Sequence, residues 1–181
     1  KESVYEGEFR NGKFEGDGTL DDVVKGFVYE GKFHRGVAHG YGVCTWGQGW
    51  NYKGDWVNDR REGYGILSEG VEGGEVYEGH WKNDQWHGKG KLIFNGGGCY
   101  DGEFKNHKIE GRGKYVFADG SVYNGSFRND LREGQGNMVY EDGAKYDGEW
   151  RNNWREGNGS MYHTDGSVFR GTFRGDSKVC G

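Results

Sequence analysis

The chain of 181 residues has a net charge of -5, 38 glycines and no proline. Its seven Trp, twelve Tyr and ten Phe outnumber its 21 Leu, Ile and Val residues, so it has too few aliphatic side chains for a conventional globular core. The excess of acidic residues argues against nucleic-acid binding. No apolar stretch reaches the length of a membrane span, and no signal-peptide pattern opens the chain.

A Tyr-x-Gly motif returns along the chain at a nearly constant spacing. In chain order the units begin near Tyr5, Tyr29, Tyr52, Tyr77, Tyr100, Tyr123, Tyr146 and Phe169. Most starts are 23 residues apart, which is a period typical of repeat proteins, in which each unit contacts its neighbours. We therefore predict a single array over residues 1–181, made of about seven and a half 23-residue units.

Each unit contains two turn signals. The first follows the Trp or Phe of the motif and reads, for example, Asn129-Asp130, a pair that tolerates the positive φ of tight hairpins. The second reads, for example, Asp119-Gly120, which is typical of a three-residue hairpin loop with a left-handed glycine. Each unit is therefore expected to be one hairpin, joined to the next unit by another hairpin.

The pairing of the strands follows from the lengths assumed for these loops. With four residues in the first loop, Phe104 faces Gly111 and Tyr100 faces Tyr115. With three residues in the second loop, Tyr115 also faces Tyr123 of the next unit. Both pairings put aromatic residues and glycines on one face. Charged side chains then occupy the other face. The expected fold class is all-β: an elongated, single-layer, twisted antiparallel meander of consecutive β-hairpins.

The order of residues within the units resembles that of a known repeat family. Tyr77, Gly79, Trp81, Gly88 and Gly90 show the order Tyr-x-Gly-x-Trp followed by Gly-x-Gly. This order is similar to that of MORN (membrane occupation and recognition nexus) repeats, and the resemblance covers nearly the whole chain. It implies a solenoid-like rod that scaffolds protein assembly, at the cytoskeleton, at a cilium or at the cytoplasmic face of a membrane.

No catalytic constellation accompanies the repeats. Serines lack a Gly-x-Ser-x-Gly setting, and the Gly-x-Gly pairs lie in expected strands with no helix after them, unlike a dinucleotide motif. His39 and His87 occupy a position that holds Glu in other units, so they are interpreted as polar strand residues. We predict a non-enzyme without a cofactor. The resemblance leaves one alternative open, a regulatory array of a larger enzyme.

The aromatic face is the first candidate binding surface. Because a single-layer sheet does not hide a whole face by itself, part of this face is expected to stay accessible and to bind a protein segment along a groove. The alternative is that the rings pack only against glycine and one another. The candidate residues are Tyr29, Trp56, Tyr77, Trp81, Tyr100, Phe104, Tyr123, Phe127 and Trp150.

Basic residues at the hairpin tips form the second candidate surface. Stacked along the array, they could bind acidic segments of a partner protein, or phosphoinositides and other anionic lipids, as the family name implies. The candidates are Arg60, Arg61, Lys108, Arg132 and Arg155. The alternative is structural, because the assumed register sets Arg128 opposite Glu133 and Arg151 opposite Glu156 as cross-strand ion pairs.

Self-association is expected at the C-terminal repeats. The segment from Val168 to Phe173 reads as an edge strand with free N–H and C=O groups, which can pair with a second copy of the chain. The alternatives are that the tail folds back over this edge or that further sequence continues the sheet. The residues predicted at the homodimer interface are Trp150, Met161, Tyr162, Phe169 and Phe173.

The cysteines and His163 give weak signals. Cys44, Cys99 and Cys180 occupy different positions in their units, so they form no disulfide framework and suit a reducing compartment. His163 replaces an aromatic residue, and with Cys180 it could contribute to a zinc site shared between two chains. Two ligands without regular spacing are poor evidence, so no metal is predicted.

Overall fold

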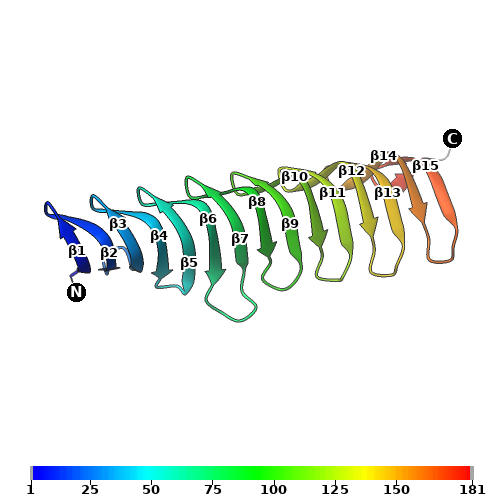
Figure 1. Ribbon diagram of the computed structural model, residues 1–181. Helices are drawn as coiled ribbons and strands as arrows, with labels where there is room; N and C mark the ends of the chain where they lie inside the picture. Colours follow the sequence, from blue (N-terminus) through cyan, green and yellow to red (C-terminus); the bar gives the residue numbers. More distant parts are fainter. Residues whose placement is uncertain (1, 180–181) are drawn as a thin grey trace. The chain divides into compact units, whose positions relative to one another are not determined.

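The computed structural model describes residues 2–179, and within this range it contains strands and turns but no helix. Sixteen antiparallel strands follow one another in sequence order in one open sheet, as a series of hairpins (Figure 1). The predicted all-β meander is therefore confirmed. The strands are β1 (Val4–Arg10), β2 (Lys13–Asp22), β3 (Phe27–His34), β4 (Val37–Trp46), β5 (Trp50–Val57), β6 (Arg60–Glu69), β7 (Val76–Lys82), β8 (Gln85–Ile93), β9 (Cys99–Lys105), β10 (Lys108–Val116), β11 (Val122–Arg128), β12 (Leu131–Val139), β13 (Lys145–Arg151), β14 (Trp154–Tyr162), β15 (Val168–Arg174) and β16 (Ser177–Lys178).

Contacts between residues divide the chain into two compact units, Lys1–Gly88 and Lys89–Gly181. In each unit the buried side chains lie on one face of the strands, here called the inner face, and alternate with polar side chains on the outer face. On β11, for example, Tyr123 and Phe127 are buried, whereas Asn124 between them is exposed. This alternation is the expected pattern of a sheet with one solvated face.

The turn between the two strands of each repeat has two residues, not the four that were assumed. Arg128 pairs with Leu131 and Lys105 pairs with Lys108, so Asn129 and Asp130 alone connect their strands. Both have positive φ, 49° and 68°. Two successive left-handed residues define a type I′ turn, for which Asn-Asp and Asn-Gly pairs are well suited.

A β-bulge after this turn restores the predicted register. Phe104 faces Ile109, not Gly111, but beyond the bulge Gly102 faces Gly113 and Tyr100 faces Tyr115. Gly111, with φ of +67°, is one of the two extra residues on β10. The predicted four-residue turn and the predicted Phe104–Gly111 pair are therefore wrong, whereas the predicted pairs farther from the turn are confirmed.

The turn between successive repeats has the predicted three-residue loop. The Phe117 N–H donates to the Ser121 carbonyl at 2.8 Å, which closes the loop, and Gly120 has φ of +90°. The carboxylate of Asp119 accepts a hydrogen bond from the Ser121 N–H at 2.8 Å. As predicted, Tyr115 then faces Tyr123 of the next repeat.

Each motif tyrosine lies flat on a pair of facing glycines. Tyr100 is 0% exposed, and a Cβ atom on Gly102 or Gly113 would overlap its ring. The Tyr100 hydroxyl donates to the Glu103 carbonyl, three residues farther along the same strand, at 3.2 Å. The absence of side chains at these glycines thus provides the floor on which the tyrosine is buried without a second layer.

Candidate functional site

The candidate aromatic residues form the core of each unit instead of an accessible stripe. Their exposed fractions lie between 0 and 7%, so the expectation that this set stays partly accessible is wrong. The physical reason is that the rings pack edge to face on the glycine floor. The residues concerned are Tyr29, Trp56, Tyr77 and Trp81 in the first unit and Tyr100, Phe104, Tyr123, Phe127 and Trp150 in the second. Their role in partner binding stays a prediction.

Within each unit the buried rings connect neighbouring repeats. In the second unit Trp150 contacts Tyr146 of its own repeat and Tyr123 of the preceding repeat, with ring centroids 5.2 and 5.3 Å apart and nearly perpendicular planes. Its indole N–H also donates to the Gly136 carbonyl at 3.1 Å. Each edge-to-face pair contributes about 0.5–1.5 kcal/mol beyond area burial. The same contacts recur at Trp56 in the first unit.

Burial of the tyrosines predicts that the fold is lost at high pH. Burial raises the pKa of Tyr123 and of Tyr146 from 10.0 to about 12, and it raises the pKa of Tyr52 and Tyr100 as well. The folded state therefore retains protons that the unfolded chain releases above pH 10. The contribution of these tyrosines to the free energy of unfolding is complete below pH 10 and is lost as the pH rises towards 12. Each pKa unit gained by one tyrosine corresponds to about 1.4 kcal/mol of stability. We expect tyrosinate absorbance and loss of circular dichroism to appear together in an alkaline titration. Ionisation of these tyrosines before the circular dichroism changes would contradict this coupling.

Three of the five candidate lipid-binding residues lie on the inner face and are not free at the tips. The Arg132 guanidinium lies 4.3 Å from the ring centre of Trp150 and donates to Asn153, both in the next repeat. Arg155 and Arg61 make equivalent contacts, the latter 4.4 Å from Trp81. These arginines join repeats, which corrects their placement at the tips. Arg60 and Lys108 are exposed, and lipid binding by any of the five stays a prediction.

The predicted cross-strand ion pairs are not formed. Because the turn has two residues, Arg128 faces Leu131, and Arg151 faces Trp154. Instead, one carboxylate oxygen of Glu133 accepts a hydrogen bond from the Asn152 N–H of the next turn at 3.0 Å. The equivalent acceptors are Glu15, Glu62, Glu110 and Glu156. His39 and His87 replace this glutamate. The Nδ1 atom of each is buried and has no hydrogen-bond partner in the described part of the chain.

Within each unit, a pair of backbone and side-chain hydrogen bonds also joins a turn to the preceding repeat. The Asp130 carboxylate accepts from the Ile109 N–H at 2.7 Å, and the Asp130 N–H donates to the Ile109 carbonyl at 3.0 Å. Equivalent pairs join Asp59 to Ala38, Asp84 to Arg61, Asn153 to Arg132 and Asp176 to Arg155. The second residue of the turn therefore fixes the spacing of the repeats as well as the turn itself.

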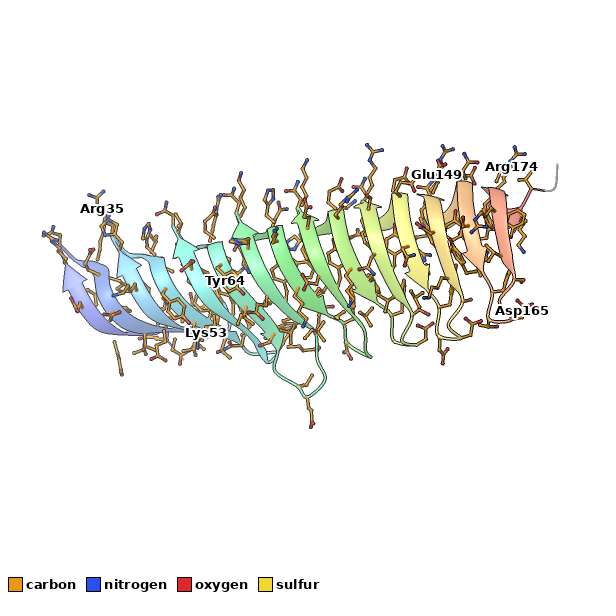
Figure 2. The ribbon with its side chains drawn as sticks, turned by 45° about the vertical axis from the view of Figure 1, so that its right-hand side comes forward. Arg35, Lys53, Tyr64, Glu149, Asp165 and Arg174 are labelled. Atoms are coloured by element: carbon orange, nitrogen blue, oxygen red, sulfur yellow. The ribbon has the colours of Figure 1, made fainter. Side chains whose placement is uncertain are left out.

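Exposed basic side chains line the edge of the second unit where these turns lie. Arg174 marks this edge in Figure 2, and Asp165 marks the opposite edge. None of these basic residues forms an ion pair within residues 2–179. They are Lys105, Lys108, Arg128, Arg151 and Arg174, with Trp154, 56% exposed, among them.

An accessible aromatic patch remains on the inner face of the second unit. It consists of Phe94, Tyr115, Phe117 and Tyr140, all half-buried, and is here called the inner patch. Phe94 stacks on Tyr115 with centroids 5.2 Å apart, and Tyr115 lies 4.5 Å from Phe117. The residues predicted to line the groove are deeply buried Tyr, Trp and Phe positions, so the prediction did not include this patch.

The residues predicted at a homodimer interface differ in accessibility. Trp150, Met161 and Phe173 are buried by 91% or more, whereas Tyr162 is 38% exposed and Phe169 is half-buried. β16 pairs with the end of β15 at Phe173 and Arg174, and the Lys178 ammonium lies 4.9 Å from the ring centre of Phe169. The edge is therefore partly covered by the following residues, as the alternative anticipated. The homodimer stays a prediction.

The weak zinc signal gains no support. Nε2 of His163 lies 3.1 Å from Nζ of Lys178, and Cys180 lies outside the described residues. Residues 2–179 contain no group of three or more His, Cys, Asp or Glu side chains suited to a metal. Cys44 and Cys99 are free thiols, and burial raises the pKa of Cys44 to about 12. No helix of sufficient length and apolarity to cross a membrane occurs in the described range.

Comparisons with known proteins agree with the repeat pattern. The family model for the MORN repeat matches residues 5–23, 29–50, 52–68, 77–99, 100–122, 123–145 and 146–168. Among curated relatives, human Alsin is 33% identical over 98 residues, which is 51% of this chain and 6% of Alsin. MORN repeat-containing protein 3 of Xenopus laevis is 35% identical over 77 residues, which is 40% of this chain and 32% of that protein. The chain thus matches only a part of each relative.

A solved structure shares the fold. The TCP domain of SAS-4 (dCPAP) of Drosophila melanogaster, solved in complex with a proline-rich motif of Ana2 (dSTIL), superposes with a TM-score of 0.50. The match covers 87% of this chain and 85% of that chain, at 14% sequence identity. At this identity the similarity concerns the arrangement of strands alone.

Proposed function

This chain belongs to the MORN repeat family, and we propose that it is a non-enzymatic scaffold that binds a protein segment on the inner face of its repeats. MORN repeats are in general protein-interaction or membrane-associated modules without catalytic activity. The SAS-4 domain, which shares the strand arrangement, was solved in complex with a proline-rich motif, and this supports a sheet of this kind as a surface for other proteins.

The observation that carries this proposal is the inner patch. Its four aromatic side chains are half-buried, and the Tyr115 ring contacts both Phe94 and Phe117. The Arg132 guanidinium lies 5.7 Å from the Phe117 ring centre and adds a positive charge beside the patch. Aromatic residues with a nearby arginine are the composition that protein interfaces favour at their centres.

A photo-crosslinking experiment tests this proposal. A benzophenone amino acid in place of Phe117 keeps an aromatic ring in the inner patch, and the same substitution at the exposed Asn124 places the probe on the outer face as a control. We expect a discrete crosslinked protein from the Phe117 position that is lost when an excess of the unlabelled chain competes. Equal crosslinking from both positions, or none from Phe117, would contradict binding at the inner face.

The basic edge of the second unit favours a second function, attachment to anionic membranes such as those rich in phosphoinositides. Lys105, Lys108, Arg128, Arg151 and Arg174 are exposed without an ion pair among the described residues, and a juxtaposed Trp154 is typical of membrane-surface contacts. Placing the same probe at Arg128 separates the two functions, because membrane attachment predicts crosslinks to phospholipid from Arg128 and not from Phe117.

The setting of the scaffold is proposed from the family resemblance. We propose the cytoplasm, at the cytoskeleton, a cilium or the cytoplasmic face of a membrane, where the thiols Cys44 and Cys99 stay reduced. Self-association through β15, with Tyr162 and Phe169 as accessible apolar contacts, fits the same role. A regulatory array within a larger enzyme is the alternative, since the chain matches only a small fraction of Alsin.

A further inference from the structure

One position of the first unit lacks a side chain that other repeats supply. The residue that faces the motif Trp or Phe across the turn is Arg61, Arg132 or Arg155 in three repeats, but it is alanine at position 38. Beside Ala38 lies a cavity of about 550 Å³, here called the Ala38 pocket. Its walls are mainly aromatic and include Phe14, Phe27, Tyr29, Phe33, Trp46 and Trp56.

The three arginines are bound in the same way by the repeat that follows each of them. Arg61 donates from Nε to the Asp84 carboxylate at 3.1 Å and from Nη2 to the Asp84 carbonyl at 3.2 Å. Its guanidinium also lies 4.4 Å from the ring centre of Trp81. Arg155 makes the same two hydrogen bonds to Asp176, at 3.1 and 3.0 Å. A carboxylate, a carbonyl and a ring together thus form a guanidinium site.

The repeat that follows Ala38 keeps the parts of this site. The Ala38 N–H donates to the Asp59 carboxylate at 2.7 Å, and the Asp59 N–H donates to the Ala38 carbonyl at 3.0 Å, as in the repeats that contain arginine. Trp56 takes the place of Trp81 and is 7% exposed, whereas Trp81, which Arg61 covers, is 3% exposed. Alanine therefore leaves a guanidinium site to which the chain supplies no guanidinium.

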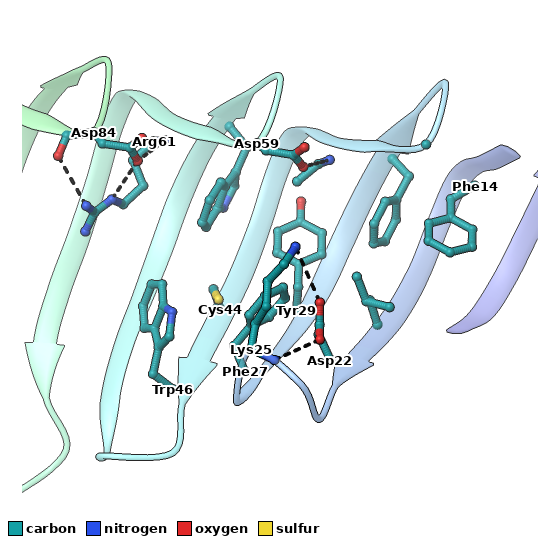
Figure 3. A pocket seen from close by; sticks show the side chains of 15 residues that line it. Phe14, Asp22, Lys25, Phe27, Tyr29, Cys44, Trp46, Asp59, Arg61 and Asp84 are labelled. Carbon is teal, nitrogen blue, oxygen red and sulfur yellow. Dashed lines mark hydrogen bonds and ion pairs between the residues drawn. The ribbon is translucent and has the colours of Figure 1, made fainter. Parts of the chain in front are cut away.

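Asp59 is the carboxylate of the Ala38 pocket that has no cationic partner among the described residues. Lys25 pairs with Asp22 at 3.6 Å and Arg61 pairs with Asp84 at 3.1 Å, which leaves one of the three lining aspartates unpaired. In Figure 3 Asp59 lies at one edge of the pocket, whereas Lys25 and Asp22 lie towards the opposite edge. A cation that enters beside Asp59 therefore forms an ion pair without breaking another.

The neighbouring Arg61 is compatible with a second guanidinium at this place. In the second unit Arg132 and Arg155 occupy the same position in consecutive repeats, so the fold accommodates guanidinium groups in adjacent sites. In the first unit Asp84 is the acceptor for Arg61, and Asp59 is available as the acceptor for the second group.

From this geometry we propose that the Ala38 pocket is a docking site for an arginine side chain of a partner protein. The guanidinium lies over Trp56 and donates to the carboxylate and the carbonyl of Asp59, as Arg61 does in the next repeat. Its planar fork of N–H donors suits these two acceptors and a ring face, which the compact ammonium of lysine does not match.

The occupant is an arginine within a polypeptide and not a free amino acid. The charged groups of the pocket other than Asp59 are paired with one another, so the ammonium and carboxylate of free arginine have no unpaired charge to bind. This inference rests on the proposed scaffold function and gives it a second site, in the first unit.

Small analogues of an arginine residue test this inference on the whole chain. The indole N–H signals of the tryptophans are followed by NMR during titration with N-acetylargininamide at millimolar concentrations. We expect the Trp56 signal to shift and the signal of Trp150, which Arg132 already covers, to stay in place. N-acetylcitrullinamide has nearly the same shape but no charge, so it is expected to bind at least about tenfold more weakly.

The variant Ala38→Arg supplies the guanidinium from the chain itself. Its arginine is expected to pair with Asp59 and lie over Trp56, which raises Tm and abolishes the Trp56 shift on addition of N-acetylargininamide. Ala118→Arg adds the same charge at an exposed turn of the second unit. This control should leave the Trp56 shift unchanged.

A second pair of variants tests the charge of Asp59. Asp59→Asn keeps an acceptor for the Ala38 N–H and removes the charge, so the chain should fold and bind N-acetylargininamide more weakly. Asp130→Asn makes the same change at the equivalent turn of the second unit, where the buried Ile109 takes the place of alanine. This control should bind as the wild type does.

Selection from a random peptide library displayed on phage extends the test to polypeptide segments. With the wild-type chain as bait, we expect enriched peptides that contain arginine. These peptides should lose binding when citrulline replaces the arginine, and also when the Ala38→Arg chain replaces the wild type.

Three results would overturn the inference. The first is a Trp56 signal that N-acetylargininamide shifts no more than N-acetylcitrullinamide does. The second is a Trp56 shift that persists in the Ala38→Arg variant, and the third is a library that enriches only peptides without arginine. None of these results affects crosslinking at Phe117, so failure of this site and failure of the proposed scaffold function are distinguishable.

Discussion

Replacing Gly113 with alanine is expected to destabilise the second unit by about 3–5 kcal/mol. The backbone of Gly113 does not have positive φ, so alanine brings no conformational strain there. Its Cβ atom would, however, overlap the ring of Tyr100, which is fully buried and pressed against Gly102 and Gly113. The ring has to leave its site, which exposes apolar area and breaks the hydrogen bond from its hydroxyl to the Glu103 carbonyl.

The measurement is the free energy of unfolding in urea, with Gly47→Ala as the matched control. Gly47 also lacks positive φ, and the nearest atom to its added Cβ would be 3.7 Å away, which is an ordinary contact. The control should therefore change stability by less than about 1 kcal/mol. If Gly113→Ala unfolded at the same urea concentration as the control, the glycine floor would not be what holds the tyrosines.

The features that the sequence predicted correctly are those fixed by local chemistry. The spacing of the motif predicted the repeats, and the Asp119-Gly120 pair predicted a three-residue loop with a left-handed glycine, which the structure contains. The pairing of Tyr115 with Tyr123 then followed by counting residues. Each of these predictions depends on one turn and on two adjacent strands.

The first turn shows where counting residues fails. An Asn-Asp pair permits a two-residue turn, but Gly111 permits a β-bulge, and the two together give the same distant register as a four-residue loop. Gly111 and Gly113 flank Arg112 in both arrangements, so the sequence alone does not distinguish a two-residue turn with a bulge from a four-residue loop. The difference decides which residue faces Phe104 and removes the predicted ion pair between Arg128 and Glu133.

The site was harder to predict because its contacts run between repeats. Glu133 bonds to the backbone of Asn152, 19 residues away, and Arg132 lies over Trp150, so cross-strand reasoning within one hairpin misses both. The burial of the aromatic face was missed because a sheet of one layer was assumed to leave it open. Ala38 occupies a position that holds a large side chain in neighbouring repeats, but only the register shows that these positions are equivalent.

Trp150 and Trp154 lie in one repeat, and truncation of Trp150 is expected to lower the free energy of unfolding much more than truncation of Trp154. Trp150→Ala removes a side chain that is 4% exposed, together with its hydrogen bond to Gly136 and the support for Arg132, so it should cost about 3–5 kcal/mol of unfolding free energy. Trp154→Ala removes a ring that is 56% exposed and should cost less than about 1 kcal/mol. Denaturant unfolding of both variants, followed by circular dichroism, gives the two values.

The same pair of variants also tests function. Membrane attachment at the basic edge requires the accessible Trp154, so a folded Trp154→Ala chain should bind anionic vesicles more weakly than the wild type. A Trp150→Ala variant as stable as the wild type would mean that Trp150 is a surface residue, as the sequence alone suggested, and not part of the core.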